Sequence, residues 1–272
     1  MVDSSYCRLP VLGLTPFNPH NGQARFFALR LPRPPGTAWE SWRPGQFVML
    51  RPDSFGLELP WGRPLCICHV TDCCLTCFFQ VRGRGTRRMA HLRPGDMVGL
   101  WGPLGNGFAK EEDAPVLLLA GGMGIAPFVG YVNTHPKPWN VSMLFGHREP
   151  LESYPVNNIN EFVPLDCFWE REPGDLRLFL QALEERMSEN ARFGGLALAC
   201  GPLPFLQAVR ELGLKLQARV QLSLESVMAC GVGACLGCVT PAGQAWPEPG
   251  KRGRPVQVCR RGPVFWVDQV EL

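Results

Sequence analysis

Long apolar runs, lysines and a strong net charge are all scarce in this 272-residue sequence, and each scarcity excludes a class of protein. The longest aliphatic run covers residues 116–120, far short of the ~20 residues that a membrane-spanning helix needs. Residues 1–7 have neither a basic start nor an apolar core, so we expect no secretory signal and a cytoplasmic location. Only four of the 27 basic residues are lysines and the net charge is +3, which argues against a nucleic-acid partner.

Cysteine, by contrast, is abundant, with 12 residues in the chain. A chain of this length without an export signal has little need of disulfides to hold a small core together. Metal binding or redox chemistry is therefore the better starting hypothesis. Most of the cysteines fall into two groups, at residues 66–77 and 230–259.

The second group has the spacing C-x4-C-x2-C…C, which is that of plant-type [2Fe–2S] ligation. Its members are Cys230, Cys235, Cys238 and, 21 positions later, Cys259. Glycines at positions 231, 233 and 237 would let the backbone wrap tightly and take positive φ angles. The alternatives are buried free thiols or a zinc ribbon, but a ribbon needs two C-x2-C pairs and the sequence offers one. We therefore predict a [2Fe–2S] cluster held by these four cysteines.

The first group, Cys66, Cys68, Cys73, Cys74 and Cys77, has no recognised ligand spacing. It lies in a stretch of alternating, β-prone residues, where cysteine behaves as a small hydrophobic residue. We interpret these residues as core and surface thiols of a hairpin, with a second metal site as the weaker alternative.

The pattern of apolar residues predicts an α+β chain of three parts. Residues 1–108 carry short apolar runs broken by Pro and Gly, typical of an antiparallel β-barrel. Residues 109–222 alternate apolar strands with helices, which indicates an α/β domain with a parallel sheet covered on both faces. Residues 223–272 form a small, loop-rich segment that contains the iron–sulfur spacing. The expected strands are 26–31, 46–50, 65–70, 75–81, 97–100, 115–120, 141–145 and 196–199, and the expected helices are 126–133, 175–188 and 205–212.

A glycine-rich turn, Gly121-Gly-Met-Gly-Ile-Ala-Pro127, follows a predicted strand and opens a predicted helix. Such a turn can present backbone N–H groups to a phosphate at a helix N-terminus. It does not match the G-x-G-x-x-G fingerprint, and the alternative is a tight turn made for packing alone.

The order of the motifs resembles that of the ferredoxin reductase-type flavoprotein family. These motifs are Arg63-Pro-Leu-Cys66, Gly83-Arg-Gly-Thr86, Gly102-Pro-Leu-Gly105, the turn at 121–127 and Cys200-Gly-Pro202. With the motifs at 226–238 and 258–265, the likeness is stronger to one branch, the iron–sulfur electron-transfer subunits of type B dihydroorotate dehydrogenases. It runs from about residue 8 to 268.

The resemblance implies a flavin barrel, a nicotinamide-nucleotide domain and a terminal [2Fe–2S] segment. It implies FAD contacts at Arg63, Pro64, Leu65, Cys66, Phe78, Phe79 and Gln80, a diphosphate at Gly85 and Thr86, a nicotinamide nucleotide at Gly121, Gly122, Gly124, Cys200, Gly201 and Pro202, and Glu225 near the flavin. The sequence departs from the family at Cys66, usually Ser or Thr, and at Gln80, often Arg. A thiol forms weaker hydrogen bonds than a hydroxyl, and a glutamine side chain has no charge with which to bind a phosphate.

The combination of parts predicts an electron-transfer subunit. A nicotinamide exchanges two electrons as hydride and a [2Fe–2S] cluster passes one at a time, so FAD is expected between NAD and the cluster. We find no acid, base and substrate clamp for oxidising an organic substrate, so we predict no catalytic residue of that kind in this chain.

The resemblance implies a partner that supplies the electrons: an FMN-containing subunit that oxidises dihydroorotate, in a heterotetramer with two copies of each chain. Electrons would then reach NAD⁺ in a step of pyrimidine biosynthesis. Two alternatives stay open. One is a paralogous NAD(P)H reductase subunit of a hydrogenase, a sulfide-type reductase or a ferredoxin-linked transhydrogenase. The other is a non-enzymatic redox sensor.

Overall fold

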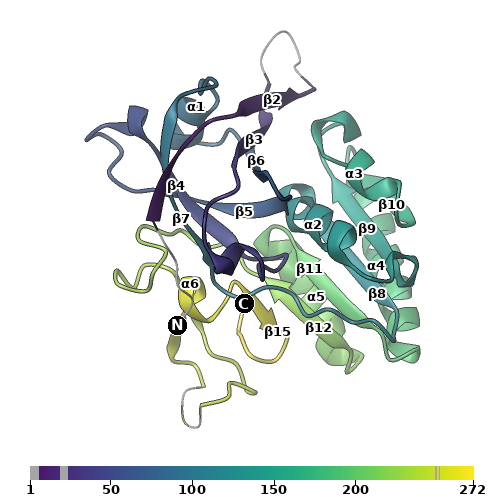
Figure 1. The fold of residues 1–272 in the computed structure, drawn as a ribbon. Helices are drawn as coiled ribbons and strands as arrows, with labels where there is room; N and C mark the ends of the chain where they lie inside the picture. The colour runs from purple at the N-terminus through teal and green to yellow at the C-terminus, as the bar shows by residue number, and fades with distance from the viewer. Residues whose placement is uncertain (1–5, 19–23, 249, 251) are drawn as a thin grey trace.

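The computed structural model describes residues 6–18, 24–248, 250 and 252–272, so most of the segment examined for a signal lies outside the described residues. Two sheets lie side by side, and a smaller C-terminal region packs below their junction (Figure 1). This arrangement confirms the predicted fold class. Among the described residues, none of the helices is long and apolar enough to cross a bilayer.

The N-terminal sheet has seven antiparallel strands in the order β1-β7-β4-β5-β6-β3-β2. The strands are β1 (Tyr6–Pro10), β2 (Gly13–Phe17), β3 (Phe26–Pro32), β4 (Phe47–Pro52), β5 (Arg63–Val70), β6 (Cys74–Gln80) and β7 (Met97–Leu104). The sheet curls, since its two edge strands, β1 and β2, follow each other in the chain with only residues 11 and 12 between them. Helix α1 (Arg84–Met89) follows β6.

Strand β4 of the N-terminal sheet is buried on both faces. Val48 and Leu50 pack into the core inside the curl, whereas Phe47 and Met49 pack into a second core shared with the C-terminal half. Since alternate residues of a strand face opposite sides, one run of apolar residues serves both cores. The two halves of the molecule are therefore joined by continuous apolar packing.

The second sheet has the order β10-β9-β8-β11-β12-β15, parallel except for β15. Its strands are β8 (Val116–Gly121), β9 (Val141–His147), β10 (Leu165–Trp169), β11 (Leu196–Cys200), β12 (Arg219–Ser223) and β15 (Val264–Trp266). The helices are α2 (Ala126–Thr134) and α3 (Asn157–Asn160) on one face, with α4 (Pro173–Arg192) and α5 (Leu203–Lys215) on the other (Figure 1). Short 3-10 helices are η1 (Thr37–Trp39), η2 (Asp53–Phe55), η3 (Gly122–Ile125), η4 (Pro138–Asn140) and η5 (Leu151–Ser153).

Both faces of this sheet are covered, as its continuous apolar strands predict. On β8, Leu118 packs with Phe128 of α2, and Leu119 packs with Phe179 of α4, in two separate cores. The order of the strands reverses between β8 and β11, since β9 and β10 lie to one side and β12 to the other. Ligands of open α/β sheets bind at such a reversal, beyond the carboxyl ends of the strands.

The C-terminal region contributes β13 (Val239–Pro241) paired with β14 (Pro255–Gln257), followed by α6 (Val258–Arg261) and β15. The sequence predicts a separate appendage here, but β15 pairs antiparallel with β12 and so completes the second sheet. Val264 and Phe265 are both 2% exposed, which explains why this short apolar run inserts at the sheet edge. The segment boundaries near residues 108 and 222 stay predictions.

Candidate functional site

A cavity of about 300 Å³ opens where the two sheets and the C-terminal region meet. Its walls come from β5, β6, the η3–α2 turn, the end of β11 and the segment after β12. Apolar side chains such as Phe47, Leu65 and Met228 form much of the wall, with a few polar groups between them. A flat ring system with polar edges suits walls of this kind.

Nine of the sequence-predicted cofactor residues line this cavity: Pro64, Leu65, Cys66, Phe78, Phe79, Gln80, Thr86, Cys200 and Glu225. Seven others lie outside its lining: Arg63, Gly85, Gly121, Gly122, Gly124, Gly201 and Pro202. Sequence reasoning assigned no role to several further lining residues, among them Arg82, Ser223 and Met228. For Ser223 and Met228 the available signal was their closeness in sequence to Glu225, since Ser223 ends β12 and Met228 follows three residues after Glu225.

The thiols of the cavity are held neutral. Burial is the main reason that the pKa of Cys66 lies well above its usual range, and the neighbouring Cys200 adds to the rise. Burial also raises the pKa of Cys200 to about 12, with the charge of Glu225 as a second cause. Although part of Glu225 faces solvent, desolvation within the cavity raises its pKa, and Arg82 opposes that rise. These walls therefore favour an uncharged ring.

Arg82 brings a guanidinium group to the wall beside Gln80. Its Nε donates a hydrogen bond to Oε1 of Gln80 at 2.8 Å, so the glutamine positions the arginine. The hydroxyl of Thr86 accepts hydrogen bonds from the N–H groups of Arg82, at 2.9 Å, and Gly83, at 3.1 Å. Thr86 thus stabilises the turn in addition to lining the cavity.

Arg63 and Gly85 lie against each other at the edge of α1. A side chain at position 85 would meet the Arg63 guanidinium, so glycine there lets the arginine keep its place against α1. Burial lowers the pKa of Arg63, and the charge of Arg84 lowers it further. Among the described residues, no carboxylate forms an ion pair with either arginine. Two adjacent cations without an acidic partner fit the diphosphate that the resemblance implies.

The glycines at the strand reversal have a packing role. A Cβ at Gly124 would collide with the backbone carbonyl of Cys200, and one at Gly121 would lie 2.9 Å from Pro202. A Cβ at Gly201 would lie 3.0 Å from the Cα of Gly121. Only Gly122, with φ +52°, faces open space, so it is the one glycine of this turn that is free to approach a ligand.

The four cysteines of the predicted cluster come together in two pairs. The N–H of Cys235 donates to Sγ of Cys230 at 3.4 Å, and the N–H of Cys259 donates to Sγ of Cys238 at 3.4 Å. No three His, Cys, Asp or Glu side chains of the described residues are grouped as ligands of a single metal ion would be. Two pairs of thiols agree instead with a cluster that takes two thiolates on each of two irons.

The ligand loop, from Cys230 to Cys238, has the predicted backbone conformation at two of its three glycines. Gly231 and Gly233 adopt φ angles of +72° and +86°, as expected. Gly237 does not, and the positive φ falls on Leu236 instead, at +57°. The loop therefore accepts a strained conformation at a leucine, which costs on the order of 1–2 kcal/mol and has to be offset by its contacts.

The same backbone prepares one sulfur for metal binding. Burial alone would raise the pKa of Cys230, but N–H groups of Cys235, Val232 and Ala234 bring it down to about 6. Burial raises the pKa of Cys259 to about 12, with Cys238 as a further cause. Cys230 therefore loses its proton more readily than Cys259, which would have to give up a proton to bind a metal.

Two histidines of the described residues, His135 and His147, are buried. His147 stacks on Phe145, with ring centroids 5.2 Å apart, and on Trp169, at 5.9 Å. His135 is buried and its Nε2 lies 2.8 Å from the carbonyl oxygen of Glu111. Both therefore serve packing, and neither lines the cavity.

Solved structures first define the class of protein by its fold. A structure described as an NADH-dependent reduced ferredoxin-NADP oxidoreductase superposes with a TM-score of 0.78 at 20% sequence identity, covering 97% of this chain and 89% of that one. The protein therefore has a ferredoxin reductase-type fold.

Sequence relatives then identify the family. The dihydroorotate dehydrogenase B (NAD(+)) electron transfer subunit of Caldanaerobacter subterraneus subsp. tengcongensis is 35% identical over 84% of this chain and 86% of its own length. The subunit of the same name from Listeria innocua is 31% identical over 84% and 87%. A family model for the iron–sulfur cluster binding domain of dihydroorotate dehydrogenase B matches residues 225–271. The chain belongs to the family of dihydroorotate dehydrogenase B electron transfer subunits, which confirms the predicted resemblance and the predicted iron–sulfur segment.

Proposed function

We propose that this chain is the electron-transfer subunit of a dihydroorotate dehydrogenase. It passes electrons from a dihydroorotate-oxidising partner through a [2Fe–2S] cluster and FAD to NAD⁺, in pyrimidine biosynthesis. The observation that carries this proposal is the continuity between cavity and ligand loop. Met228 lines the cavity and Cys230 lies two residues later, at most about 7 Å along an extended chain.

The ligand loop is also anchored to the barrel half. Nε1 of Trp101 on β7 donates a hydrogen bond to the carbonyl of Cys230 at 3.0 Å. Gly231 packs so closely on Met49 of β4 that a Cβ there would collide with it. The loop is therefore held at a fixed short distance from the cavity, as electron transfer between two bound groups requires.

The cavity is the proposed flavin site. Pro64, Leu65, Cys66, Phe78, Phe79 and Gln80 would flank the ring, with Glu225 at its edge. Arg63, Gly85 and Thr86 would hold the diphosphate, with Arg82 supplying the charge that Gln80 lacks. FAD, when bound, supplies an exchange between two-electron hydride transfer and one-electron transfer. The chain's own part is to orient the ring and to exclude water with apolar walls.

The strand reversal is the proposed nicotinamide site. Gly122 faces open space there, and Met123 and Cys200 line the same cavity from the two loops that flank the reversal. A nicotinamide bound over Cys200 would thus lie against the flavin. Gly121, Gly124, Gly201 and Pro202 would shape this site through the close packing of its two loops.

The cluster site, with Cys230, Cys235, Cys238 and Cys259 as ligands, is proposed to face the partner. Cys238 and Cys259 are buried at 2%, whereas Cys235 is exposed, so the cluster would approach the surface at the Cys235 end. Leu236, next to Cys235 in the chain, is 64% exposed, and Val227, three positions before Cys230, is 88% exposed. We place an FMN-containing catalytic subunit on this face, in a cytoplasmic heterotetramer with two copies of each chain.

The test uses the purified chain with its cofactors, alone and with the partner subunit. Alone, it should reduce an artificial acceptor with NADH and leave dihydroorotate unchanged. Adding the partner should start dihydroorotate-dependent reduction of NAD⁺. Robust dihydroorotate oxidation by the chain alone would overturn the proposal.

A second candidate is a paralogous NAD(P)H reductase subunit serving a hydrogenase, a sulfide-type reductase or a ferredoxin-linked transhydrogenase. The fold likeness to the ferredoxin-NADP oxidoreductase, which extends over 97% of this chain, favours keeping it. Purification from the native cell distinguishes the two candidate functions. A dihydroorotate dehydrogenase subunit should copurify with an FMN protein that oxidises dihydroorotate. A redox sensor would instead contain no FAD, which the visible spectrum of the pure chain decides.

A further inference from the structure

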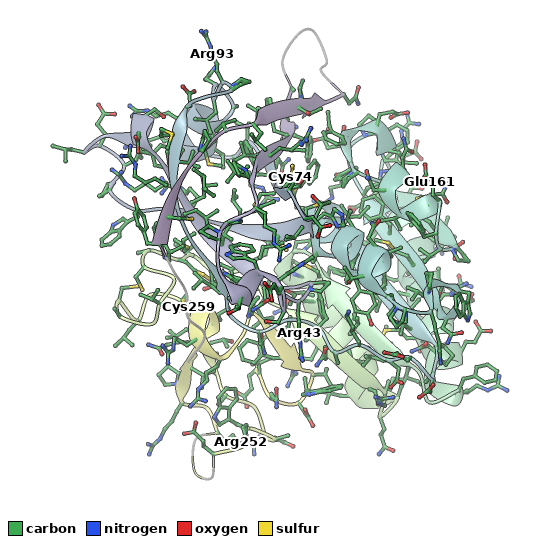
Figure 2. All side chains as sticks on the ribbon, viewed as in Figure 1. Arg43, Cys74, Arg93, Glu161, Arg252 and Cys259 are labelled. Carbon is green, nitrogen blue, oxygen red and sulfur yellow. The ribbon has the colours of Figure 1, made fainter. Side chains whose placement is uncertain are left out.

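The turn between β5 and β6 places two adjacent cysteines at the surface. Sγ of Cys73 and Sγ of Cys74 are 3.3 Å apart, and Cys73 is exposed. Neither residue lines the cavity or belongs to the cluster loop. Phe78, the first cavity residue along β6, is four residues away, about 13 Å of extended strand. In Figure 2, Cys74 and the cluster cysteine Cys259 lie in different parts of the molecule.

The turn that carries this pair is held from both sides. The N–H of Thr71 donates to the carbonyl of Cys74 at 2.8 Å, and the N–H of Arg33 donates to the carbonyl of Cys73 at 2.9 Å. The N–H of Cys74 also donates to Oγ1 of Thr71, at 3.1 Å. The two sulfurs therefore sit on a fixed backbone, and little conformational freedom is lost when something binds to both.

The surroundings of the pair are polar and carry both signs of charge, since Asp72 of the same turn forms an ion pair with Arg33 at 3.6 Å. An Nη2 group of Arg30 on β3 donates to Sγ of Cys74 at 3.7 Å, and Oγ1 of Thr71 lies 3.5 Å from Sγ of Cys73. Hydrogen bonds from Thr71 and Cys74 lower the pKa of Cys73, and Arg30 adds to the effect. Exposed thiols in such an environment are the reactive ones in proteins.

We propose that Cys73 and Cys74 form a chelating site for one soft, thiophilic centre, of the class that trivalent arsenicals represent. An atom about 2.3 Å from each sulfur, a usual thiolate–metal bond length, would span a separation of 3.3 Å with an angle of roughly 90°. A trivalent pyramidal centre has such a narrow angle, whereas tetrahedral zinc opens its ligands wider. Soft thiolates select soft partners of this kind.

The binding step balances without any redox change. With phenylarsine oxide, two As–S bonds form and the bonds between arsenic and oxygen break. The two thiol protons leave with the oxygen as one molecule of water. No electron is transferred, so the step needs no oxidant or reductant.

No other cysteine of the described residues offers a free surface pair of this kind. Cys68 and Cys77 are buried, and burial raises the pKa of both. Cys167 is an exposed residue, but its thiol is partly desolvated. This desolvation, and then the charge of Asp166, raise the pKa of Cys167. The four cluster cysteines are committed to iron under the proposed function, so Cys167 is the matched single-thiol control.

The experiment titrates the cofactor-loaded chain with phenylarsine oxide without oxygen, counting bound arsenical by intact mass. We expect one equivalent, retained in excess monothiol and released by a dithiol. Cys73→Ser or Cys74→Ser should weaken binding at least 100-fold, because the second bond of a chelate forms within the molecule at high effective concentration. Cys167→Ser should bind within twofold of the wild type.

A second measurement keeps the proposal testable if a serine variant folds poorly. In the wild type, one equivalent of phenylarsine oxide should protect Cys73 and Cys74 together from iodoacetamide, read by tandem mass spectrometry. The visible spectrum and NADH-dependent acceptor reduction should stay unchanged. Serine variants that bind within threefold of the wild type, or protection at other cysteines, would refute the site.

Discussion

Two regions of this molecule are rich in cysteine, and Cys230 in one and the buried cysteines Cys68 and Cys77 in the other have opposite environments. In the loop from Cys230 to Cys238, backbone N–H groups point at the sulfurs and lower the pKa of Cys230 to about 6. In the β5–β6 hairpin, Cys68 and Cys77 are enclosed by apolar side chains, and burial raises the pKa of both. The role of a cysteine thus depends on whether backbone donors or apolar neighbours surround it.

The largest expected effect is loss of the cluster on removing one ligand. Cys235→Ser should bleach the iron–sulfur absorption and leave the flavin bands, since the cavity residues lie on other segments. Iron and sulfide analysis with the visible spectrum checks this. Two irons and two sulfides retained per chain would contradict the ligand assignment and remove the contrast between the two regions.

A smaller effect should follow from changing the loop while keeping its ligands. At Gly231, φ is +72° and a Cβ would collide with Met49, so Gly231→Ala should lower iron content several-fold. Gly237 is the matched control, because its Cβ would meet only Sγ of Cys235, at 3.6 Å. Gly237→Ala should therefore keep iron near the wild-type level. Equal iron loss in both variants would show that backbone conformation is not the cause.

A substitution in the core of the β5–β6 hairpin should lower the stability of the protein and leave its iron content unchanged. Cys77→Ser places a hydroxyl in an apolar core, which should lower the free energy of unfolding by about 1–3 kcal/mol. Denaturant unfolding with iron analysis checks it, and the exposed Cys167→Ser is the control, expected to change little. If Cys77→Ser lost iron at unchanged stability, the hairpin would belong with the metal-binding region.

The smallest expected effect lies within the surface thiols. The pKa of Cys73 is lowered and that of Cys167 is raised, so at a given pH Cys73 carries more thiolate. Alkylation by iodoacetamide should therefore begin at lower pH for Cys73, as measured by mass spectrometry of each site between pH 6 and about 9. Identical pH profiles of alkylation at Cys73 and Cys167 would show that the two thiols do not differ in pKa.

Apart from β12, which was missed, the sequence predicts the central strands better than the edge strands. Strands such as β6 and β8 are buried runs with strong β preference, and the prediction places them within a residue or so. β1 and β2 were missed because each contains proline, which usually marks a break in a strand. Both lie at the edges of the N-terminal sheet, where a missing N–H is tolerated.

Spacing alone predicts the four cysteines of the cluster, and the structure brings them together as two pairs. In the glycine turn at 121–124, close packing against Cys200 and Pro202 explains two of the glycines, and the nucleotide site there stays a prediction. Arg82 was missed although it follows Gln80 by two positions at the end of the strand predicted at 75–81, a spacing that puts two side chains on the same face.

The pairing of β15 with β12 has a consequence for how the chain is made. β12 ends at Ser223, but its open edge is closed only by residues 264–266, which are synthesised after the whole iron–sulfur loop. Until then the nucleotide half carries an unpaired strand edge, the kind of surface that joins other chains. The iron–sulfur loop lies between these two strands in sequence, and Cys259 comes just before β15. We therefore expect the second sheet to close late, together with the approach of the last iron ligand.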